Sequence, residues 1–343
     1  MRRSRSAEVP VSVGAPNRPP RVALAVGTVV MLSALVAACG GQTTSAVKKN
    51  VAPVALTMAE DPGVTALPQY VAEAQGFFTA HHLKVTIKPV LNIDTIPAGL
   101  LAGQFQFGMT AQPILLTGAQ HGLDLVVTAG QAFDTPAAPI EGVMVGGGSP
   151  ITSPTGLVGK VVGLPALTGN IEECFVSWLQ HGGVVPSSVH MVQVAFPNMA
   201  AQLSAHRIDA AVVIQPFEAA IAGQGGRSLA DPCMSVDPSG TGFSLQISAR
   251  AWAQKHRDVV VAVEESLDEA DAFILAHPAQ AKSVLARFTS VSPQLVGSLT
   301  LPVYKEYESA SDLQRWVSVM RSQGLLGSAP VSTAKLLDEP VRH

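Results

Sequence analysis

Residues 95–129, TIPAGLLAGQFQFGMTAQPILLTGAQHGLDLVVTA, decide the fold class because they alternate helix-like and strand-like patterns over short distances. Helices are predicted over Thr95–Ala102 and Pro113–Gln120, each stopped by a nearby glycine. Strands are predicted over Phe105–Met109 and Leu123–Ala129. A strand, a helix and a second strand in this order make a β-α-β unit, whose parallel strands are covered by helices. The stretch therefore predicts an α/β protein.

The same alternation continues in both directions from this stretch. Before it, strands are predicted over Val54–Met58 and Leu83–Val90, with a helix between them. After it, residues 160–222 repeat the pattern as a second α/β unit. Phe243–Ile247 then has the composition of a strand that returns to the first unit, and helical spacing dominates the rest of the chain.

This order predicts two lobes, of which the first is discontinuous. A chain of 343 residues has room for two ordinary domains. We expect residues 54–141 and 240–343 to form the first lobe and residues 142–239 the second, so that the chain crosses between the lobes twice. The crossings are predicted at Gly146–Gly148 and Gly240–Gly242, because glycine tolerates the backbone angles that a hinge needs.

The overall composition excludes some classes of protein. The net charge is −3, only 14% of the residues are charged, and 47% are hydrophobic. Such a chain can bury a large core and is not globally disordered. A nucleic-acid partner would call for clustered Lys and Arg, so none is expected.

The N-terminal segment differs in composition from the rest of the chain. A basic leader precedes Val22–Ala38, an uncharged run that ends in small residues, as in a secretory signal. Val36-Ala37-Ala38-Cys39 resembles the bacterial lipobox, which implies cleavage before Cys39 and a diacylglycerol on its thiol. We therefore expect a signal peptide over residues 1–38 and a lipidated tether over 39–53. The alternative is an uncleaved membrane anchor, since the apolar run is about one span long. Both interpretations place the remaining chain outside the cytoplasmic membrane.

The residue patterns of catalysis and metal binding are missing from the sequence. Neither His-Glu-x-x-His nor Gly-x-Ser-x-Gly occurs. His81 and His82 are adjacent and are interpreted as solvated, so no metal site is expected. Outside the membrane Cys174 and Cys233 could form a disulfide, and the alternative is a pair of buried thiols.

Six short segments resemble one family in their order and spacing. They are Glu73–Phe78, His82–Val85, Leu101–Gly108, Gly118–Gly122, Leu157–Gly163 and Leu203–Ala211. Together they resemble the nitrate/sulfonate/taurine group of ABC-transporter solute-binding proteins, which also includes binders of thiamine-pyrimidine precursors. The resemblance runs from about Val54 to Leu326. Gln106 stands where this family usually has Asp.

The resemblance implies a class II periplasmic-binding-protein-like fold, with two α/β lobes, two crossing strands and a ligand cleft between the lobes. It implies a monomer that captures a small molecule and delivers it to an ABC permease and its ATPase. With the lipid anchor, the protein would lie on the outer face of the cytoplasmic membrane of a bacterial cell. No cofactor is expected.

Ligand contacts are predicted at the carboxyl ends of the strands, where open α/β sheets collect ligands. The candidates are Glu60, Asp61, Thr110, Gln112, Gln131, Asp134, Thr168, Asn170, Gln215 and Glu218. Four of these are carboxylates and none is Lys or Arg, which disfavours an anionic ligand. We therefore expect a neutral or cationic heterocycle or amine, clamped by Glu60 and Glu218 from opposite lobes. Helix N-termini alone can hold an oxyanion, so an alkanesulfonate, taurine or nitrate stays an alternative.

Two further functions belong to other classes. Enzymes of pyrimidine synthesis share the expected fold but carry a cysteine-rich motif with a histidine, whereas Cys174 stands alone in Glu172–Phe175. A non-enzyme is therefore expected. A sensor that feeds a signalling protein is the third possibility, and the sequence does not separate it from transport.

Overall fold

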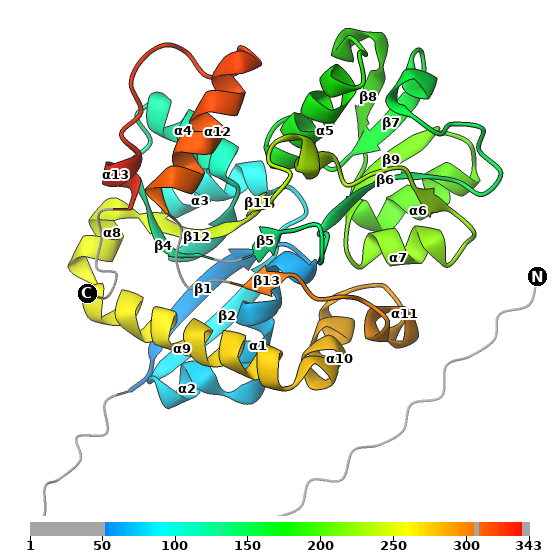
Figure 1. The fold of residues 1–343 in the computed structure, drawn as a ribbon. Helices are drawn as coiled ribbons and strands as arrows, with labels where there is room; N and C mark the ends of the chain where they lie inside the picture. The colour runs from blue at the N-terminus through cyan, green and yellow to red at the C-terminus, as the bar shows by residue number, and fades with distance from the viewer. Residues whose placement is uncertain (1–51, 131, 305–308, 338–343) are drawn as a thin grey trace, which may run out of the picture. The chain divides into compact units, whose positions relative to one another are not determined.

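The computed structural model describes residues 52–130, 132–304 and 309–337. The predicted signal peptide, Cys39, nearly all of the tether and the candidate ligand contact Gln131 lie outside the described residues. Two five-stranded sheets and one three-stranded sheet make up the described fold (Figure 1).

The first sheet has the strand order β2-β1-β3-β12-β4. Its strands are β1 (Val54–Glu60), β2 (Leu83–Pro89), β3 (Phe107–Thr110), β4 (Leu125–Gly130) and β12 (Leu245–Ala249). β1 runs parallel to β2 and β3, whereas β12 runs antiparallel to β3 and β4. Its helices are α1 (Leu67–Gln75), α2 (Phe77–Ala80), α3 (Ile96–Leu101) and α4 (Gln112–Gln120). The predicted return of the chain to the first sheet near residue 245 is confirmed.

The second sheet has the strand order β10-β6-β9-β7-β8. Its strands are β6 (Glu141–Val145), β7 (Val161–Leu164), β8 (His190–Gln193), β9 (Ala210–Ile214) and β10 (Arg227–Ser228). The helices of this lobe are α5 (Asn170–His181), α6 (Phe196–Ser204) and α7 (Phe217–Ala222). β9 is a continuous apolar run, AAVVI, because the sheet buries it on both faces.

The chain passes between the two sheets through a small antiparallel sheet of β11 (Thr241–Gly242), β5 (Ala132–Asp134) and β13 (Val303–Tyr304). One crossing runs from β5 to β6, and the other enters β11. Gly146–Gly148 is therefore not at a crossing, because it follows β6, which already belongs to the second sheet. Gly240 does lie at the second crossing, at φ 108°, where a Cβ atom would be 2.6 Å from the carbonyl oxygen of Asp134.

Helices from the last third of the chain complete the first lobe. They are α8 (Arg250–Lys255), α9 (Arg257–Ala276), α10 (Pro278–Phe288), α11 (Pro293–Gly297), α12 (Ala310–Ser322) and α13 (Thr333–Leu336). The Tyr70 ring of α1 stacks on Phe288 of α10 at a centroid distance of 4.1 Å. α10 starts at Pro278, and proline suits the first turn of a helix. The backbone leaves the helical conformation at His256, so α8 and α9 are separate helices.

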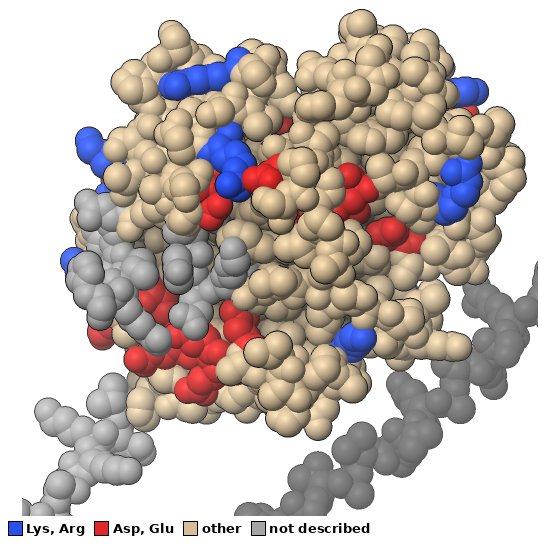
Figure 2. Space-filling model, viewed as in Figure 1, with Lys and Arg blue, Asp and Glu red and all other residues tan. Residues whose placement is uncertain are grey.

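Short 3₁₀ helices join several of these elements. They are η1 (Val64–Ala66), η2 (Ile93–Thr95), η3 (Pro154–Leu157), η4 (Pro186–Ser188) and η5 (Pro232–Ser235). Within the described residues, no helix is both long and apolar enough to cross a membrane. On the face in Figure 2, carboxylates gather over α9, while the Lys and Arg side chains of the described residues are scattered and form no basic patch there.

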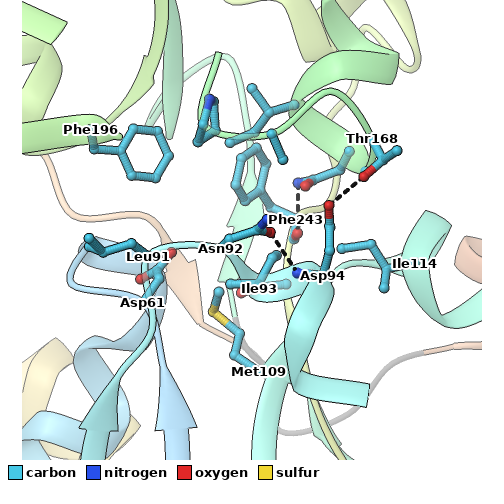
Figure 3. A pocket seen from close by; sticks show the side chains of 16 residues that line it. Asp61, Leu91, Asn92, Ile93, Asp94, Met109, Ile114, Thr168, Phe196 and Phe243 are labelled. Atoms are coloured by element: carbon cyan, nitrogen blue, oxygen red, sulfur yellow. Dashed lines mark hydrogen bonds between the residues drawn. The ribbon is translucent and has the colours of Figure 1, made fainter. Parts of the chain in front are cut away.

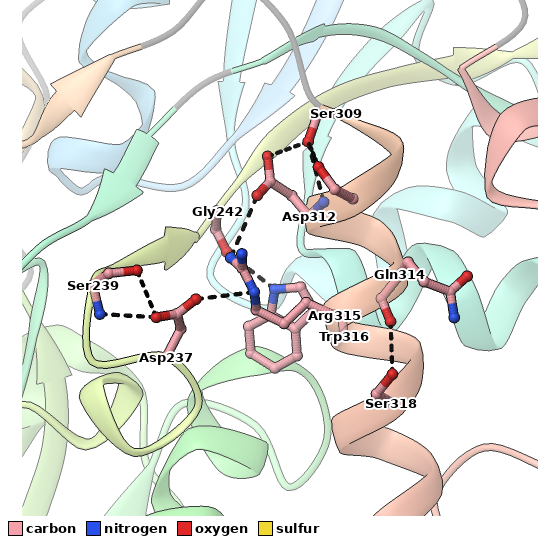
Figure 4. Close-up of polar contacts among 10 residues, drawn as sticks. Asp237, Ser239, Gly242, Ser309, Asp312, Gln314, Arg315, Trp316 and Ser318 are labelled. Carbon is pink, nitrogen blue, oxygen red and sulfur yellow. Dashed lines mark hydrogen bonds and ion pairs between the residues drawn. The ribbon is translucent and has the colours of Figure 1, made fainter.

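A polar network fixes α12 to the second crossing (Figure 4). The Arg315 guanidinium pairs with Asp237 at 2.9 Å, and Trp316 Nε1 donates to the Gly242 carbonyl oxygen at 3.3 Å. Ser239 bonds the same Asp237 carboxylate through its amide and its hydroxyl. These bonds hold the pKa of Asp237 below its ordinary value, so the carboxylate stays ionised for its partners.

Candidate binding site

A pocket opens where strand ends of the first lobe face a helix N-terminus of the second (Figure 3). The first lobe contributes Asp61, Leu91–Asp94, Met109 and Ile114. The second lobe contributes Pro165, Ala166, Thr168–Ile171 and Phe196, and the segment after β11 contributes Phe243 and Ser244. The space between these walls is about 480 Å³, including the mouth that opens to solvent.

Apolar side chains form most of the pocket wall. The Phe196 ring stacks on Phe217 at 5.4 Å with an interplanar angle of 11°, which fixes its orientation. Met109 and Phe243 are buried beside it in the wall. Flat apolar walls of this kind favour a ligand with a ring or a short hydrocarbon chain.

Asp94 is the pocket carboxylate with hydrogen-bonding capacity to spare. The Asn92 side chain accepts a bond from the Asp94 amide at 3.0 Å, which caps η2 and sets the position of Asp94. Across the pocket, the Thr168 hydroxyl donates to Asp94 Oδ2 and so links the two lobes. The other oxygen, Oδ1, is buried without a hydrogen-bond partner among the described residues. Burial raises the pKa of Asp94, and the bond from Thr168 opposes part of that rise.

Asp61 lines the same pocket but its oxygens already have partners. Oδ1 accepts from the Gly63 amide at 2.8 Å and from the Thr65 hydroxyl at 2.7 Å, while Oδ2 also lies 2.6 Å from that hydroxyl. Burial raises the pKa of Asp61, and the bonds from Thr65 and Gly63 oppose the rise. Asp61 therefore stabilises the turn after β1 and has less capacity for a ligand than Asp94.

The N-terminus of α5 forms part of the second-lobe wall. Gly169 precedes it at φ 89°, a left-handed conformation that favours glycine, and Asn170 Nδ2 donates to the Phe243 carbonyl oxygen at 3.0 Å. The Glu173 amide bonds the Gly169 carbonyl at 3.0 Å, so the helix ladder starts there. The earlier amides of the turn are the kind of donor that a helix N-terminus offers to a ligand.

Only part of the predicted ligand set lies at this pocket. Asp61, Thr168 and Asn170 line it. Glu60, Thr110, Gln112, Asp134, Gln215 and Glu218 do not line it, and Gln131 is outside the described residues. Glu60 is fully buried and accepts a bond from Gln246 Nε2 at 3.0 Å, and Glu218 accepts from Gln215 Nε2 at 2.8 Å. The expected clamp of Glu60 and Glu218 therefore has no place at this pocket.

Asp134 and Glu218 belong instead to a group of acidic side chains where the crossings enter the second lobe. The group, named here the acidic cluster, consists of Asp134, Glu141, Glu218 and Asp231. Burial raises the pKa of Asp134 to about 9, that of Glu218 to about 7 and that of Asp231 to about 6. Burial, reinforced by the neighbouring carboxylates, also raises the pKa of Glu141 well above its ordinary value.

The two cysteines lie together beside the acidic cluster. Cys174 of α5 and Cys233 of η5 form a disulfide with a Cα–Cα distance of 4.6 Å. Both side chains are fully buried. Of the two alternatives that the sequence left open, the structure contains the disulfide.

Sequence reasoning missed Asn92 and Asp94, although a signal for them existed. Both follow the predicted strand Leu83–Val90, and the rule that selected the other candidates applies equally to the end of that strand. Phe243 and Ser244 carried no such signal, because they reach the pocket only through the return of the chain into the first sheet.

Comparison with known proteins identifies the family. The NMT1/THI5 like family matches residues 64–281, which is more than half of the chain and includes strands of all three sheets, but neither β1 nor β13. The chain belongs to the NMT1/THI5-like family. The family resemblance predicted from the sequence is confirmed. A search of curated proteins found no match.

Solved structures share the fold of this NMT1/THI5-like protein. The alkanesulfonate-binding protein SsuA from Xanthomonas axonopodis pv. citri, bound to MOPS, is 19% identical with a TM-score of 0.71, and the alignment covers 83% of this chain and 98% of SsuA. A ligand-binding component of an ABC-type import system from Staphylococcus aureus, with zinc bound, is 14% identical with a TM-score of 0.71, over 83% and 96% of the two chains. The periplasmic nitrate-binding protein NrtA from Synechocystis PCC 6803 is 14% identical with a TM-score of 0.69, over 83% and 85%.

These likenesses confirm the predicted fold, a two-lobe α/β structure of the periplasmic-binding-protein type. The similar proteins differ in their ligands: one is an alkanesulfonate-binding protein, one a nitrate-binding protein and one a binding component with zinc bound. The fold of the NMT1/THI5-like protein therefore leaves its ligand to be inferred from its own pocket.

Proposed function

We propose that this protein is the solute-binding component of an ABC importer, which captures a small molecule between its lobes and delivers it to the permease and ATPase. The family, the likeness to a binding component of an import system and the pocket between two lobes support this proposal. Lobe closure on a ligand removes the ligand from water and creates a surface that a permease can recognise. The proposed lobes are residues 54–141 with 240–343, and residues 142–239.

The proposed ligand is a neutral or cationic heterocycle or amine. One observation carries this choice: the described pocket lining contains Asp61 and Asp94 and neither Lys nor Arg. The buried Oδ1 of Asp94 has no hydrogen-bond donor among the described residues, so a ligand N–H group would satisfy it. A ligand carboxylate or sulfonate near the same atom would be repelled.

A second candidate ligand is a sulfonate or another oxyanion. The observation that favours it is the α5 N-terminus, whose first residues Gly169–Ile171 line the pocket. Aligned amide donors and the helix dipole attract negative charge there, by about 0.3–1 kcal/mol in exposed sites. This attraction is smaller than the repulsion expected from a carboxylate at close range, so the amine stays the first choice.

A thermal-shift screen tests the charge of the ligand. Purified protein is expected to gain stability with amines or pyrimidines and to show no shift with nitrate, taurine or alkanesulfonates at equal concentration. A ligand at 100 times its Kd should stabilise the folded state by about 2.7 kcal/mol. A shift with taurine or an alkanesulfonate, together with none from any amine, would contradict the proposed ligand while leaving the transport role intact.

Binding is proposed as the function rather than catalysis. The cysteine-rich motif of the pyrimidine-synthesis enzymes is missing from the sequence, and Cys174 and Cys233 are both engaged in one disulfide. No thiol of the described residues is therefore free to act as a nucleophile. Unchanged recovery of the ligand after incubation with the protein, measured by mass spectrometry, tests this point.

The lipid anchor at Cys39 is also part of the proposal. Cys39 follows Val36-Ala37-Ala38, and Gly40-Gly41-Gln42 begins a polar tether after it. Cys39→Ser is expected to move the protein from the membrane fraction to the soluble fraction or to leave it unprocessed, as measured by fractionation and intact mass. Wild-type protein that still carries Met1–Ala38 would contradict the anchor.

A further inference from the structure

Glu141, Cys174 and Cys233 meet at the point where both crossings enter the second lobe. Glu141 is the first residue of β6, Cys174 lies in the first half of α5, and Cys233 lies in η5 just before the chain returns through β11. One carboxylate oxygen of Glu141 and the two Sγ atoms all lie within 4.8 Å of one another. All three side chains are buried. Three potential metal ligands from three separate elements are thus already brought together.

The Glu141 carboxyl group makes none of the hydrogen bonds that hold the described residues together. Its side chain is 1% exposed, and neither carboxylate oxygen has a hydrogen-bond partner among the described residues. A buried carboxylate without partners destabilises the fold, so each such group in a native protein calls for an explanation. The rest of the acidic cluster lies near Glu141 and, together with burial, raises its pKa. A buried carboxyl group without partners, with other acidic groups beside it, is suited to a cation that takes the place of its proton.

We propose that reduction of the Cys174–Cys233 disulfide converts this place into a zinc site, in which the two thiolates and the Glu141 carboxylate bind one Zn²⁺ ion. Thiolate and carboxylate are established zinc ligands, and a pair of thiolates selects a soft or borderline metal over Mg²⁺ or Ca²⁺. In a tetrahedral site with metal–ligand distances of about 2.0–2.3 Å, ligand atoms lie about 3.5 Å apart. The present upper limit of 4.8 Å between the three atoms is therefore within reach of small side-chain movements.

Conversion of the disulfide into a zinc site requires one external reductant, a dithiol. A dithiol gives two electrons and two protons to the disulfide, which becomes two thiols while the dithiol closes to its own disulfide. Zn²⁺ then displaces the two thiol protons and the proton that the buried Glu141 carboxyl group holds, and the resulting carboxylate fills a third position. A water molecule can take the fourth position. In the oxidised chain the sulfur atoms are bonded to each other and provide no thiolate, so the proposed site exists only after reduction.

A metal ion at this place would link three elements of the second lobe close to the pocket. Cys174 lies four residues after Asn170, whose turn lines the pocket, and Cys233 precedes the second crossing. The disulfide ties α5 to η5 in the oxidised chain. In the reduced chain the zinc ion would replace that tie with a metal bridge that also includes β6. The proposal concerns this bridge alone and is independent of the ligand in the pocket.

The test compares zinc binding by oxidised and reduced full-length protein. The chain is reduced with a phosphine, desalted, checked for free thiols at both Cys174 and Cys233, separately from that of Cys39, and dialysed against Zn²⁺ without oxygen. We expect about one zinc per reduced chain and none above background per oxidised or thiol-alkylated chain, by elemental analysis. Co²⁺ in place of zinc should give the near-ultraviolet absorption of thiolate-to-metal charge transfer. A reduced chain that stays folded and binds no zinc would overturn the proposal.

A matched pair of variants tests the role of the carboxylate. Glu141→Gln should weaken zinc binding at least tenfold, while Glu172→Gln, on the same helix as Cys174, should leave it unchanged. Equal zinc affinity for Glu141→Gln and the wild type would remove Glu141 from the site and overturn the proposal as stated. If reduction unfolds the chain, zinc should restore the native circular dichroism, and a failure to restore it counts equally against the proposal.

Discussion

Asp94→Asn is expected to weaken the binding of a cationic ligand about a hundredfold and to change the binding of a neutral ligand of the same shape only slightly. The substitution keeps the size of the side chain and an oxygen that can accept the Thr168 bond, so it removes the charge and little else. Two opposite charges 4 Å apart attract by about 4 kcal/mol at an effective dielectric of 20 and about 1 kcal/mol in water. The pocket mouth opens to solvent, so an intermediate value of about 2–3 kcal/mol is expected, which corresponds to a factor of about 100.

Calorimetry with the best amine from the screen and a neutral analogue measures this effect. Asp258→Asn, an exposed change on α9 with the same loss of charge, is the control and should leave both affinities unchanged. Wild-type affinity for the amine should also fall on acidification, because protonated Asp94 carries no charge. Since burial raises the pKa of Asp94, the loss should begin at a higher pH than for an ordinary aspartate. An amine that binds Asp94→Asn as tightly as wild type would show that Asp94 does not recognise the ligand charge.

Trp316→Ala is expected to lower the free energy of unfolding by about 3–5 kcal/mol, the usual cost of removing a large aromatic side chain from a core. Trp316 is fully buried in α12, and its Nε1 donates to the Gly242 carbonyl oxygen at the second crossing. The substitution therefore leaves a cavity and an unpaired carbonyl at a place where the fold depends on contact between α12 and β11.

Urea unfolding followed by circular dichroism measures this loss. Trp178→Ala is the control, because Trp178 is only partly buried on α5 and its removal should cost clearly less. A loss below about 1 kcal/mol for Trp316→Ala would show that α12 is not a necessary part of the first lobe.

The elements of the fold could be predicted because their patterns are local. The alternation of buried and exposed residues in β2 indicates an edge strand, and the continuous apolar run of β9 indicates a central strand. The position of the crossing could not be predicted in this way. Gly146–Gly148 permits a hinge, but β6 pairs with β9 before that run begins, and the pairing decides where the second lobe starts.

The candidate site was harder to predict because it depends on the direction in which each side chain points and on the order of the strands in the sheet. Glu60 and Asp61 are neighbours at the end of β1, and successive side chains of a strand point to opposite sides. The strand-end rule predicts both residues as ligand contacts, yet only Asp61 reaches the pocket, while Glu60 bonds Gln246 of β12 within the first lobe. The helices and strands that pack on each side decide which of two neighbouring side chains faces a ligand. Their arrangement in space cannot be obtained from local sequence patterns.

The place of β12 between β3 and β4 has a consequence for the order in which the protein is made. β3 and β4 have left the ribosome long before residues 245–249 exist, so the gap between them has to stay unfilled during the synthesis of more than a hundred residues. The strands of the second sheet, in contrast, all lie within residues 141–228 and can pair as soon as they emerge. The second lobe, whose sheet can be completed early in synthesis, is therefore inserted in the sequence of the first lobe, whose sheet can be completed only late. Throughout that interval, the facing edges of β3 and β4 are open to pairing with other chains.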